Sequence, residues 1–277
     1  MPLVTIAIPV YNADKYLQDA IQSVVNQTFR DWVLVLINDG SSDDSLMIMQ
    51  KFASAYDNIF IIDDGENKGL VTRLNESVAM TTTKYYARMD ADDIMHYSRL
   101  EEQVRYLEEH EDIDVLGSSA MLIDNNNNIK GSWLSKGEVY RFIHPTVIGK
   151  TQWFKNNLYS TWAIRAEDTE LWIRTKDKSN FYALQKPLLF YREYGVPSFN
   201  KTIKSLQTMI VVYSNYKEYG KSAIWGLVNI AVCVCKIIMY AFFYIIGQMD
   251  FLMSKRRRFV VPKEHQQNHL ELIKSIK

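Results

Sequence analysis

The sequence predicts an α/β fold with a mostly parallel central sheet, helices on both faces and a C-terminal helical, membrane-associating segment. Three observations support this prediction. Strand-like and helix-like stretches alternate through the first third of the chain, polar residues follow each strand-like stretch, and one long apolar run lies near the C-terminus. Such alternation is typical of parallel sheets, because a covering helix connects each strand to the next.

Four strand-like stretches come first. Each is apolar and ends at polar or turn residues, and they cover residues 3–10, 32–37, 58–62 and 84–89. Between them lie helix-like stretches, such as the one with apolar residues at Leu17, Ile21 and Val24 and the one at residues 70–80. In open sheets of this kind, ligands bind beyond the carboxyl ends of the strands.

The middle of the chain is less regular. Leu100, Val104 and Leu107 indicate another helix, and four asparagines at 125–128 separate two strand-like stretches. This pattern predicts a β-hairpin of residues 114–124 and 129–134. A further strand is predicted at residues 181–191.

The C-terminal part contains an apolar stretch at residues 223–249, interrupted by Asn229, Lys236 and Gln248, and a basic flank at 255–258. About 20 apolar residues suffice to span a bilayer as a helix. A pair of buried helices also fits, but the basic flank favours association with anionic lipid. A helical hairpin lying in the cytoplasmic leaflet fits Lys236 better than a true span does. The predicted domains are residues 1–200, the catalytic domain, and 201–277, the helical region.

Composition excludes some classes of protein. The chain has 277 residues, 47% of them hydrophobic and 23% charged, and its formal net charge is zero. This balance supports a globular core and argues against nucleic acid as a partner. The two cysteines, Cys233 and Cys235, face different ways on a helix, so they are a poor metal pair and fit a reducing, cytosolic setting.

Three carboxylates end the fourth strand-like stretch. Side chains two residues apart share a face of an extended chain, so Asp90 and Asp92 are expected to point together, with Asp93 turned away. Two convergent carboxylates suit Mg²⁺ or Mn²⁺ with a phosphate as a further ligand. A solvated acidic turn that caps the next helix is the alternative, and it is the commoner case for an isolated Asp-x-Asp.

Six segments together resemble the inverting GT-A glycosyltransferases of family 2, of the bacterial surface-polysaccharide or O-antigen type. Their order and spacing match over roughly the first 195 residues. The segments are residues 8–12, 38–43, 67–75, 89–93, 144–146 and 166–172. The resemblance implies a Rossmann-like nucleotide-binding sheet in a GT-A fold.

The resemblance also implies roles for individual residues. Asp92 would bind the metal that bridges the diphosphate, and Asp168 would be the general base. The expected donor-binding residues are Pro9, Val10, Tyr11, Asn12, Asp39, Arg73, Asp90 and Ala91. Glu167, His144 and Trp172 are expected on the acceptor side. From the residues alone, Asp168 equally fits the first turn of a helix, where the helix dipole favours anions.

The implied activity is metal-dependent transfer of one hexosyl or N-acetylhexosaminyl group from a nucleotide sugar, most commonly a UDP-sugar in this family. The expected acceptor is a polyprenyl-diphosphate-linked glycan at the cytoplasmic face of the bacterial inner membrane, in O-antigen or capsule synthesis. No Gln-x-x-Arg-Trp motif follows Asp168, which indicates non-processive transfer. The stretch Tyr191-Arg192-Glu193-Tyr194 lacks the histidine of many relatives, which puts a phosphate contact there in doubt.

Two other classes of protein compete with a glycosyltransferase. A dinucleotide-binding oxidoreductase needs Gly-x-Gly-x-x-Gly after the first strand, and residues 9–16 contain no glycine. A catalytically inactive, membrane-bound binding or scaffold subunit with the same fold stays open. The intact carboxylates at 39, 90, 92 and 168 favour the enzyme over this scaffold.

Overall fold

A computed structural model describes residues 1–135, 142–192, 199–249, 251–252 and 265–276. The chain forms two compact units. The first contains Met1–Leu158, Lys178–Glu193 and Val260–Lys277, and the second contains Tyr159–Asp177 and Tyr194–Phe259. These units divide the chain at different residues from the predicted 1–200 and 201–277, and that domain division stays a prediction.

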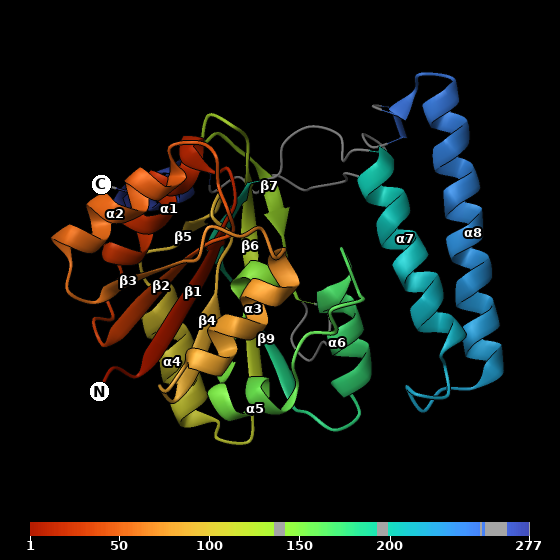
Figure 1. Ribbon diagram of the computed structural model, residues 1–277, viewed down its shortest axis with the longest axis horizontal. Helices are drawn as coiled ribbons and strands as arrows, with labels where there is room; N and C mark the ends of the chain where they lie inside the picture. The colour runs from red at the N-terminus through yellow and green to blue at the C-terminus, as the bar shows by residue number, and fades with distance from the viewer. Residues whose placement is uncertain (136–141, 193–198, 250, 253–264, 277) are drawn as a thin grey trace. The chain divides into compact units, whose positions relative to one another are not determined.

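The first unit starts with four parallel strands, as predicted (Figure 1). They are β1 (Val4–Val10), β2 (Trp32–Asn38), β3 (Ile59–Asp63) and β4 (Tyr85–Arg88), and they pair in the order β3-β2-β1-β4. The helices that connect them are α1 (Asp14–Val25), α2 (Ser45–Ala55) and α3 (Leu70–Met80). Strands β1, β2 and β4 are largely buried, whereas in β3 only Ile59 is fully buried, and local patterning was enough to predict all four.

Helices cover both faces of this sheet, and two adjacent tyrosines show how. Tyr85 packs into a core cluster with residues of α1, α2 and α4 (Arg99–Glu109). Tyr86 points the other way: its hydroxyl bonds Ser77 of α3 at 2.8 Å, and its ring packs against Phe154 of α5 (Thr151–Asn156). Side chains alternate along a strand, so one residue step reaches the opposite helical layer.

The rest of the sheet is mixed in direction. Beyond β4, the strand order among the described residues is β8-β6-β9-β5, and β7 also pairs with β6. The strands are β5 (Ile94–Met95), β6 (Val115–Ile123), β7 (Ile129–Trp133), β8 (Ile148–Lys150) and β9 (Phe181–Arg192). Only β6 and β9 pair in parallel here. The predicted hairpin of β6 and β7 is confirmed, and β9 has nearly its predicted bounds.

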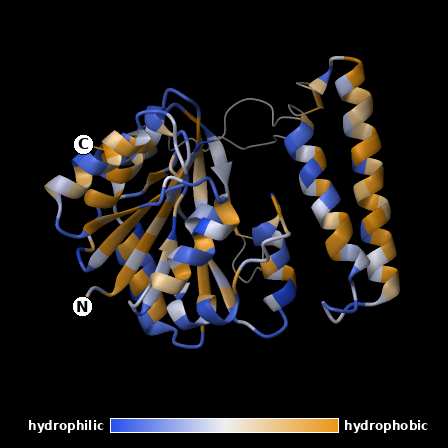
Figure 2. Cartoon of the chain, viewed as in Figure 1, coloured by the Kyte–Doolittle hydropathy of each residue, from blue (hydrophilic) through white to orange (hydrophobic). Residues whose placement is uncertain are grey.

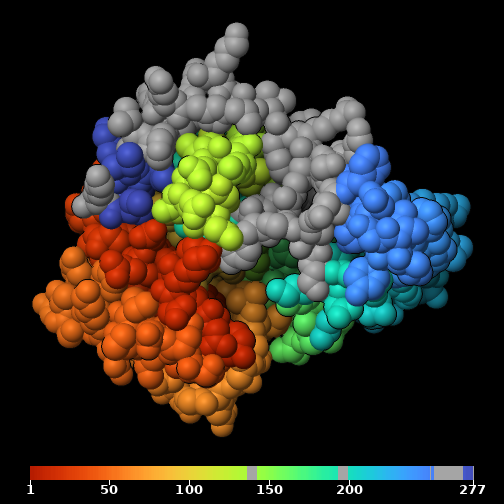
Figure 3. Space-filling view, turned by 90° about the horizontal axis from the view of Figure 1, so that it is seen from above, coloured from red at the N-terminus to blue at the C-terminus, as the bar shows by residue number. Residues whose placement is uncertain are grey.

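The last helix, α10 (His265–Ile276), belongs to the first unit. Ser275 connects it to the N-terminal part of the fold, because its carbonyl accepts from Asn26 Nδ2 at 3.1 Å and its hydroxyl accepts from Tyr97 N at 3.1 Å. Leu272 is buried in a cluster with Phe190. Figure 3 accordingly shows the dark blue end of the chain beside the red N-terminal atoms.

The second unit consists of α6 (Glu167–Thr175), α7 (Phe199–Ser214) and α8 (Ala223–Ile245). Ser222 caps α8 by accepting a hydrogen bond from Trp225 N at 3.2 Å. Gly226 lets α7 and α8 approach closely, because a Cβ there would lie 2.7 Å from the carbonyl oxygen of Tyr213. Cys233 is buried in the small core of this unit, whereas Cys235 is exposed.

Helix α8 is long and apolar enough to cross a membrane, and only 17% of its most apolar window is buried. In Figure 2, most of the length of α8 has the colour of hydrophobic residues. A core helix of a soluble protein would be mostly buried, so this exposure is consistent with a membrane-associating segment. The basic flank at 255–258 lies outside the described residues.

Candidate functional site

An acidic turn follows β4 and brings three carboxylates together. One oxygen from each of Asp90, Asp92 and Asp93 lies within 4.8 Å of the others. The expectation that Asp93 turns away was wrong, because the chain leaves the extended conformation: Asp93 N donates to Asp90 O at 3.4 Å. The alternation of an extended strand therefore no longer applies. Ala91, within the turn, is 9% exposed.

The acidic turn has the chemistry of a divalent cation site. Asp93 is fully buried, and its Oδ1 accepts a hydrogen bond from Arg192 N at 2.7 Å. Among the described residues, its Oδ2 has no hydrogen-bond partner. Burial and the charges of Asp90 and Asp92 raise the pKa of Asp93 well above its usual value. A hard cation would relieve this repulsion, so three carboxylates with one orphaned oxygen fit Mg²⁺ or Mn²⁺.

Arg192, at the end of β9, holds the acidic turn in place. Its Nε donates to Asp92 O at 2.7 Å, and its two other nitrogens reach Asp124 O and Asn127 Oδ1, each at 2.7 Å. Its guanidinium lies 4.2 Å from the centre of the Tyr16 ring. The sequence alone indicates only a doubtful phosphate contact for this arginine. The sequence shows an arginine at the end of a long strand, which was the available signal for this role. It does not show the partners of the arginine, because they lie 65 to 100 residues away.

Asp39, just beyond the end of β2, is 5% exposed and anchors a neighbouring loop. Its Oδ1 accepts from Lys68 N at 2.7 Å, Gly69 N at 3.1 Å and Arg73 Nε at 2.9 Å. Gly69 has φ +83°, a conformation that residues with a side chain rarely adopt. Oδ2 accepts only from Gly69 N at 3.1 Å among the described groups, so it keeps capacity for another donor.

Arg73 is fully buried and uses all five of its N–H groups within the protein. Besides Asp39, its acceptors are Asp64, which receives two bonds, Glu76 and the carbonyl of Glu66. Hydrogen bonds from Arg73 and Lys68 hold the pKa of Asp64 far below its usual value. This geometry gives Arg73 a structural role in the loop, and its predicted phosphate contact stays a prediction.

The end of β1 supplies the predicted aromatic face. Pro9 is partly buried and Val10 fully buried, whereas the Tyr11 side chain is 56% exposed. Asn12 has φ +48°, and its Oδ1 accepts from Ser42 N at 2.8 Å. The exposed ring therefore stands at the same carboxyl edge of the sheet as Asp39, whose backbone N donates to Val10 O at 2.8 Å.

Helix α6 of the second unit carries Asp168. Its side chain is partly exposed, and its Oδ1 accepts from Thr169 N at 2.6 Å. Glu167 and Trp172 are 8% and 2% exposed, so both residues are buried in this structure. The catalytic and acceptor-side roles of these three residues stay predictions.

Glu170, also in the first turn of α6, is a carboxylate with a structural role. It is buried, binds Arg174 Nε at 2.9 Å and accepts from the Tyr219 hydroxyl at 3.2 Å. Burial, with the charge of Glu170, raises the pKa of Tyr219. Glu170 is thus a buried carboxylate of the first turn, whereas Asp168 is partly exposed.

His144 lies in the first unit, in the short 3₁₀ helix η1 (His144–Thr146). It is 7% exposed, and burial, with the charge of Arg88, holds its pKa well below the usual value. The ring is therefore neutral near pH 7. Its predicted acceptor-side contact is not tested by this placement.

Known proteins with sequences similar to this chain are named glycosyltransferases. The family described as Glycosyl transferase family 2 matches residues 5–171. The uncharacterized glycosyltransferase MJ1057 of Methanocaldococcus jannaschii is 32% identical over 239 residues, 79% of this chain and 82% of that protein. TuaG of Bacillus subtilis, a putative teichuronic acid biosynthesis glycosyltransferase, is 30% identical over 108 residues, 39% of this chain and 43% of TuaG.

Solved structures share the fold. The crystal structure of S. aureus TarS 1-349 in complex with UDP-GlcNAc matches with a TM-score of 0.66 and 17% identity, covering 100% of this chain and 82% of that one. The mannosyltransferase PcManGT from Pyrobaculum calidifontis, in complex with GDP-Man and Mn²⁺, matches with a TM-score of 0.60 and 14% identity, covering 99% and 86%. At such identities the likeness shows the GT-A fold alone.

Proposed function

Since the chain belongs to glycosyl transferase family 2, we propose that it transfers one sugar, with inversion and without processivity, from a UDP-sugar to a glycan acceptor. The observation that carries this proposal is the cluster of Asp90, Asp92 and Asp93 at the end of β4. The same edge of the sheet presents Asp39 and the exposed ring of Tyr11. A base-binding face beside a cation site is what a nucleoside diphosphate requires.

In this proposal Asp92 holds Mg²⁺ or Mn²⁺, with the neighbouring carboxylates of the acidic turn around it. The bound cation would neutralise the charge that develops on the nucleoside diphosphate as it leaves. The fit of the site supports the assignment, because hard carboxylate oxygens converge and one is buried without a partner. The Mn²⁺ in the PcManGT complex agrees with it.

The donor is held by residues of the first unit. Tyr11 stacks on the base, backbone groups of Pro9 to Asn12 reach its edge, and the free capacity of Asp39 Oδ2 accepts an N–H of uracil. Asp90 and Ala91 lie against the ribose of the donor. Arg73 serves the donor indirectly, because it fixes Asp39 and the loop beside it.

Asp168 is the proposed general base, which takes the proton of the acceptor hydroxyl as that oxygen attacks the anomeric carbon. A positioned base contributes about 10²–10⁴-fold to the rate. Asp168 is partly exposed, whereas Glu170 of the same helical turn is buried, and this accessibility supports the role. Glu167, Trp172 and His144 are proposed to line the acceptor side, after local rearrangement of the buried side chains.

The acceptor is proposed to be a polyprenyl-diphosphate-linked glycan at the cytoplasmic face of a membrane. The apolar, largely exposed α8 supports this idea, because it would bring the enzyme to a lipid-borne substrate. The name of TuaG points to cell-surface polysaccharide synthesis as the setting. The transferred group is then a hexosyl or N-acetylhexosaminyl residue.

Label transfer tests the proposal. The full-length protein in bacterial membranes would receive labelled UDP-glucose, UDP-galactose or UDP-GlcNAc with Mn²⁺, and lipid-extractable label would be counted. We expect label in the lipid fraction for one donor, reduced about 10²–10⁴-fold by Asp168→Asn. Asp177→Asn, at an exposed carboxylate of the same unit, is the control. Unchanged transfer by Asp168→Asn would refute the assigned base, and no transfer from any donor would favour the scaffold alternative.

A further inference from the structure

Three positively charged side chains line one pocket of the second unit. The pocket has a volume of about 360 Å³, and Arg165, Lys201 and Lys236 contribute to it. Its other lining residues are Thr202, Ser205, Leu206 and Tyr240. Among the residues that the structure describes, the lining contains no carboxylate and none of the three cations is in an ion pair. Such a pocket has the charge and donors to receive an anion.

The three cations come from separate elements, so their convergence is a property of the folded unit. Arg165 lies two residues before the start of α6 and has a left-handed conformation, with φ +66°, which is unfavourable for a residue with a side chain. Lys201 lies in the first turn of α7, and Lys236 lies in the middle of the apolar α8. All three residues are exposed to solvent, and a charge at Lys236 would be costly if α8 entered a membrane, unless an anion balanced it.

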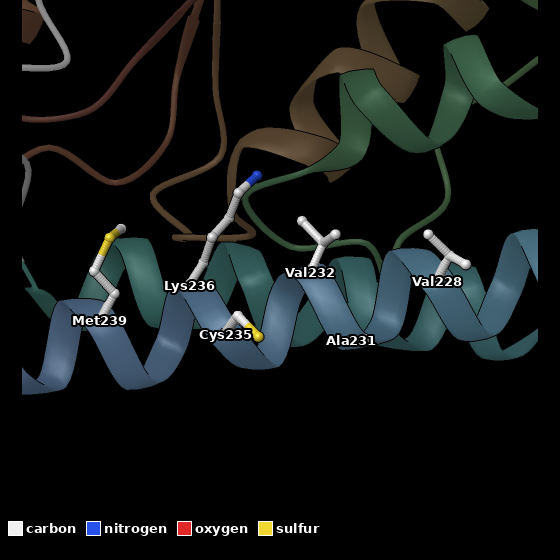
Figure 4. A pocket seen from close by; sticks show the side chains of 6 residues that line it. All are labelled: Val228, Ala231, Val232, Cys235, Lys236 and Met239. Carbon is white, nitrogen blue, oxygen red and sulfur yellow. The ribbon is translucent and has the colours of Figure 1, made fainter.

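Lys236 also borders a second, apolar hollow. This hollow has a volume of about 440 Å³ and is lined by one side of α8. Figure 4 shows Val228, Val232 and Met239 on the same side of the helix as Lys236. A basic pocket therefore adjoins an apolar groove through one shared lysine. A ligand that fills both must carry an anionic group attached to a hydrocarbon chain.

We propose that these two hollows bind a phosphorylated long-chain lipid, the acceptor lipid itself. Its phosphate would lie among Arg165, Lys201 and Lys236, and the first part of its chain would lie along Val228 and Val232. The inference rests on the proposed function and adds the subsite for the acceptor's anchor. Arg165 precedes Asp168 by only three residues, so a lipid phosphate bound to Arg165 would lie near the proposed base.

Binding to the full-length protein in phosphatidylcholine nanodiscs tests the proposal. The probe is farnesyl diphosphate, with farnesol and inorganic diphosphate as its two halves, all in EDTA to prevent binding through a metal at the acidic turn. We expect farnesyl diphosphate to bind at least tenfold more tightly than either half. Lys201→Gln and Lys236→Gln should each weaken it about tenfold, since each removes one charge-assisted contact.

The matched control is Lys204→Gln. Lys204 is exposed in the first half of α7 and does not line the pocket, so this change should leave binding unchanged. Equal affinity of wild type, Lys201→Gln and Lys236→Gln would overturn the proposal. Full displacement of farnesyl diphosphate by phosphatidylglycerol at the same mole fraction would overturn it too, because the pocket would then be a general site for membrane headgroups.

A UDP titration with Mn²⁺ on the same samples separates this inference from the proposed function. If UDP binds and farnesyl diphosphate does not, the lipid subsite is refuted and the donor site stands. If farnesyl diphosphate binds in a lysine-dependent way and UDP does not, the lipid subsite stands and the donor proposal fails.

Discussion

At the scale of single residues, Arg73 and Asp39 form a buried ion pair on which a whole loop depends. Their side chains are 0% and 7% exposed. Removing one partner of such a pair leaves a buried charge uncompensated, which costs about 3–5 kcal/mol. We therefore expect Arg73→Ala to lower the free energy of unfolding by about that amount in urea denaturation.

Arg105→Ala is the control for this change, because Arg105 is 63% exposed and pairs with Glu102 at the surface. Exposed pairs contribute about 0–1 kcal/mol, so little change is expected. A similarly small change for Arg73→Ala would contradict the role given to Arg73.

His144 gives the protein a defined sensitivity to acid. Its pKa is depressed in the folded state, so below about pH 6.5 the unfolded chain binds a proton that the folded chain does not. The contribution of His144 to the free energy of unfolding is therefore complete above pH 6.5. It is lost as the pH falls, by up to about 1.4 kcal/mol per pH unit.

His144→Asn should remove this contribution, so that its unfolding free energy falls less steeply below pH 6.5 than that of the wild type. Urea denaturation at several pH values measures the slope. His110→Asn, at an exposed histidine, should keep the wild-type slope. Identical slopes for wild type and His144→Asn would show that His144 is not the buried neutral group described here.

At the scale of elements, β9 positions the acidic turn through Arg192. Lysine keeps the charge but lacks the planar set of donors, so it cannot bond Asp92 O, Asp124 O and Asn127 together. We expect Arg192→Lys to weaken Mn²⁺-dependent UDP binding about tenfold and to leave metal-free binding unchanged. Calorimetry with Arg30→Lys, a surface arginine, as control measures this. Equal loss with and without Mn²⁺ would argue against a role in the turn.

Helix α8 is expected to drive membrane binding through its exposed apolar side chains. Leu227 and Ile238 are 68% and 63% exposed, and burying each in lipid is worth about 1.5–3 kcal/mol. The double change Leu227→Ser and Ile238→Ser should lower co-sedimentation with lipid vesicles at least tenfold. Phe60→Ser, at an exposed apolar residue of β3, should not. Undiminished sedimentation of the double variant would contradict the membrane role of α8.

The elements differ in how far the sequence predicts them. The strands β1 to β4 and helix α3 follow from local apolar patterns, because each is buried on a regular face. The turn after β4 was predicted with the wrong geometry, since the pattern cannot show where an extended chain ends. The partners of Arg192 were also beyond reach, because tertiary folding brings together residues about 100 positions apart.

At the scale of the whole molecule, the C-terminal helix returns to the first unit. The contact of Ser275 with Asn26 spans 249 residues, and no local pattern announces it. Removing residues 223–277 would therefore take away both the apolar α8 and α10, whose Leu272 packs in a buried cluster with Phe190. Point changes on α8 are the cleaner test of membrane binding for this reason.

The central claim is that the first unit binds a nucleoside diphosphate through a divalent cation. The measurement that tests it most directly is calorimetric titration of UDP and GDP, each with Mn²⁺ and with EDTA, into full-length protein purified in detergent. We predict that UDP binds with Mn²⁺, that GDP binds at least tenfold more weakly, and that Asp92→Asn removes the Mn²⁺ dependence. Failure of both nucleotides to bind under either condition would contradict the account.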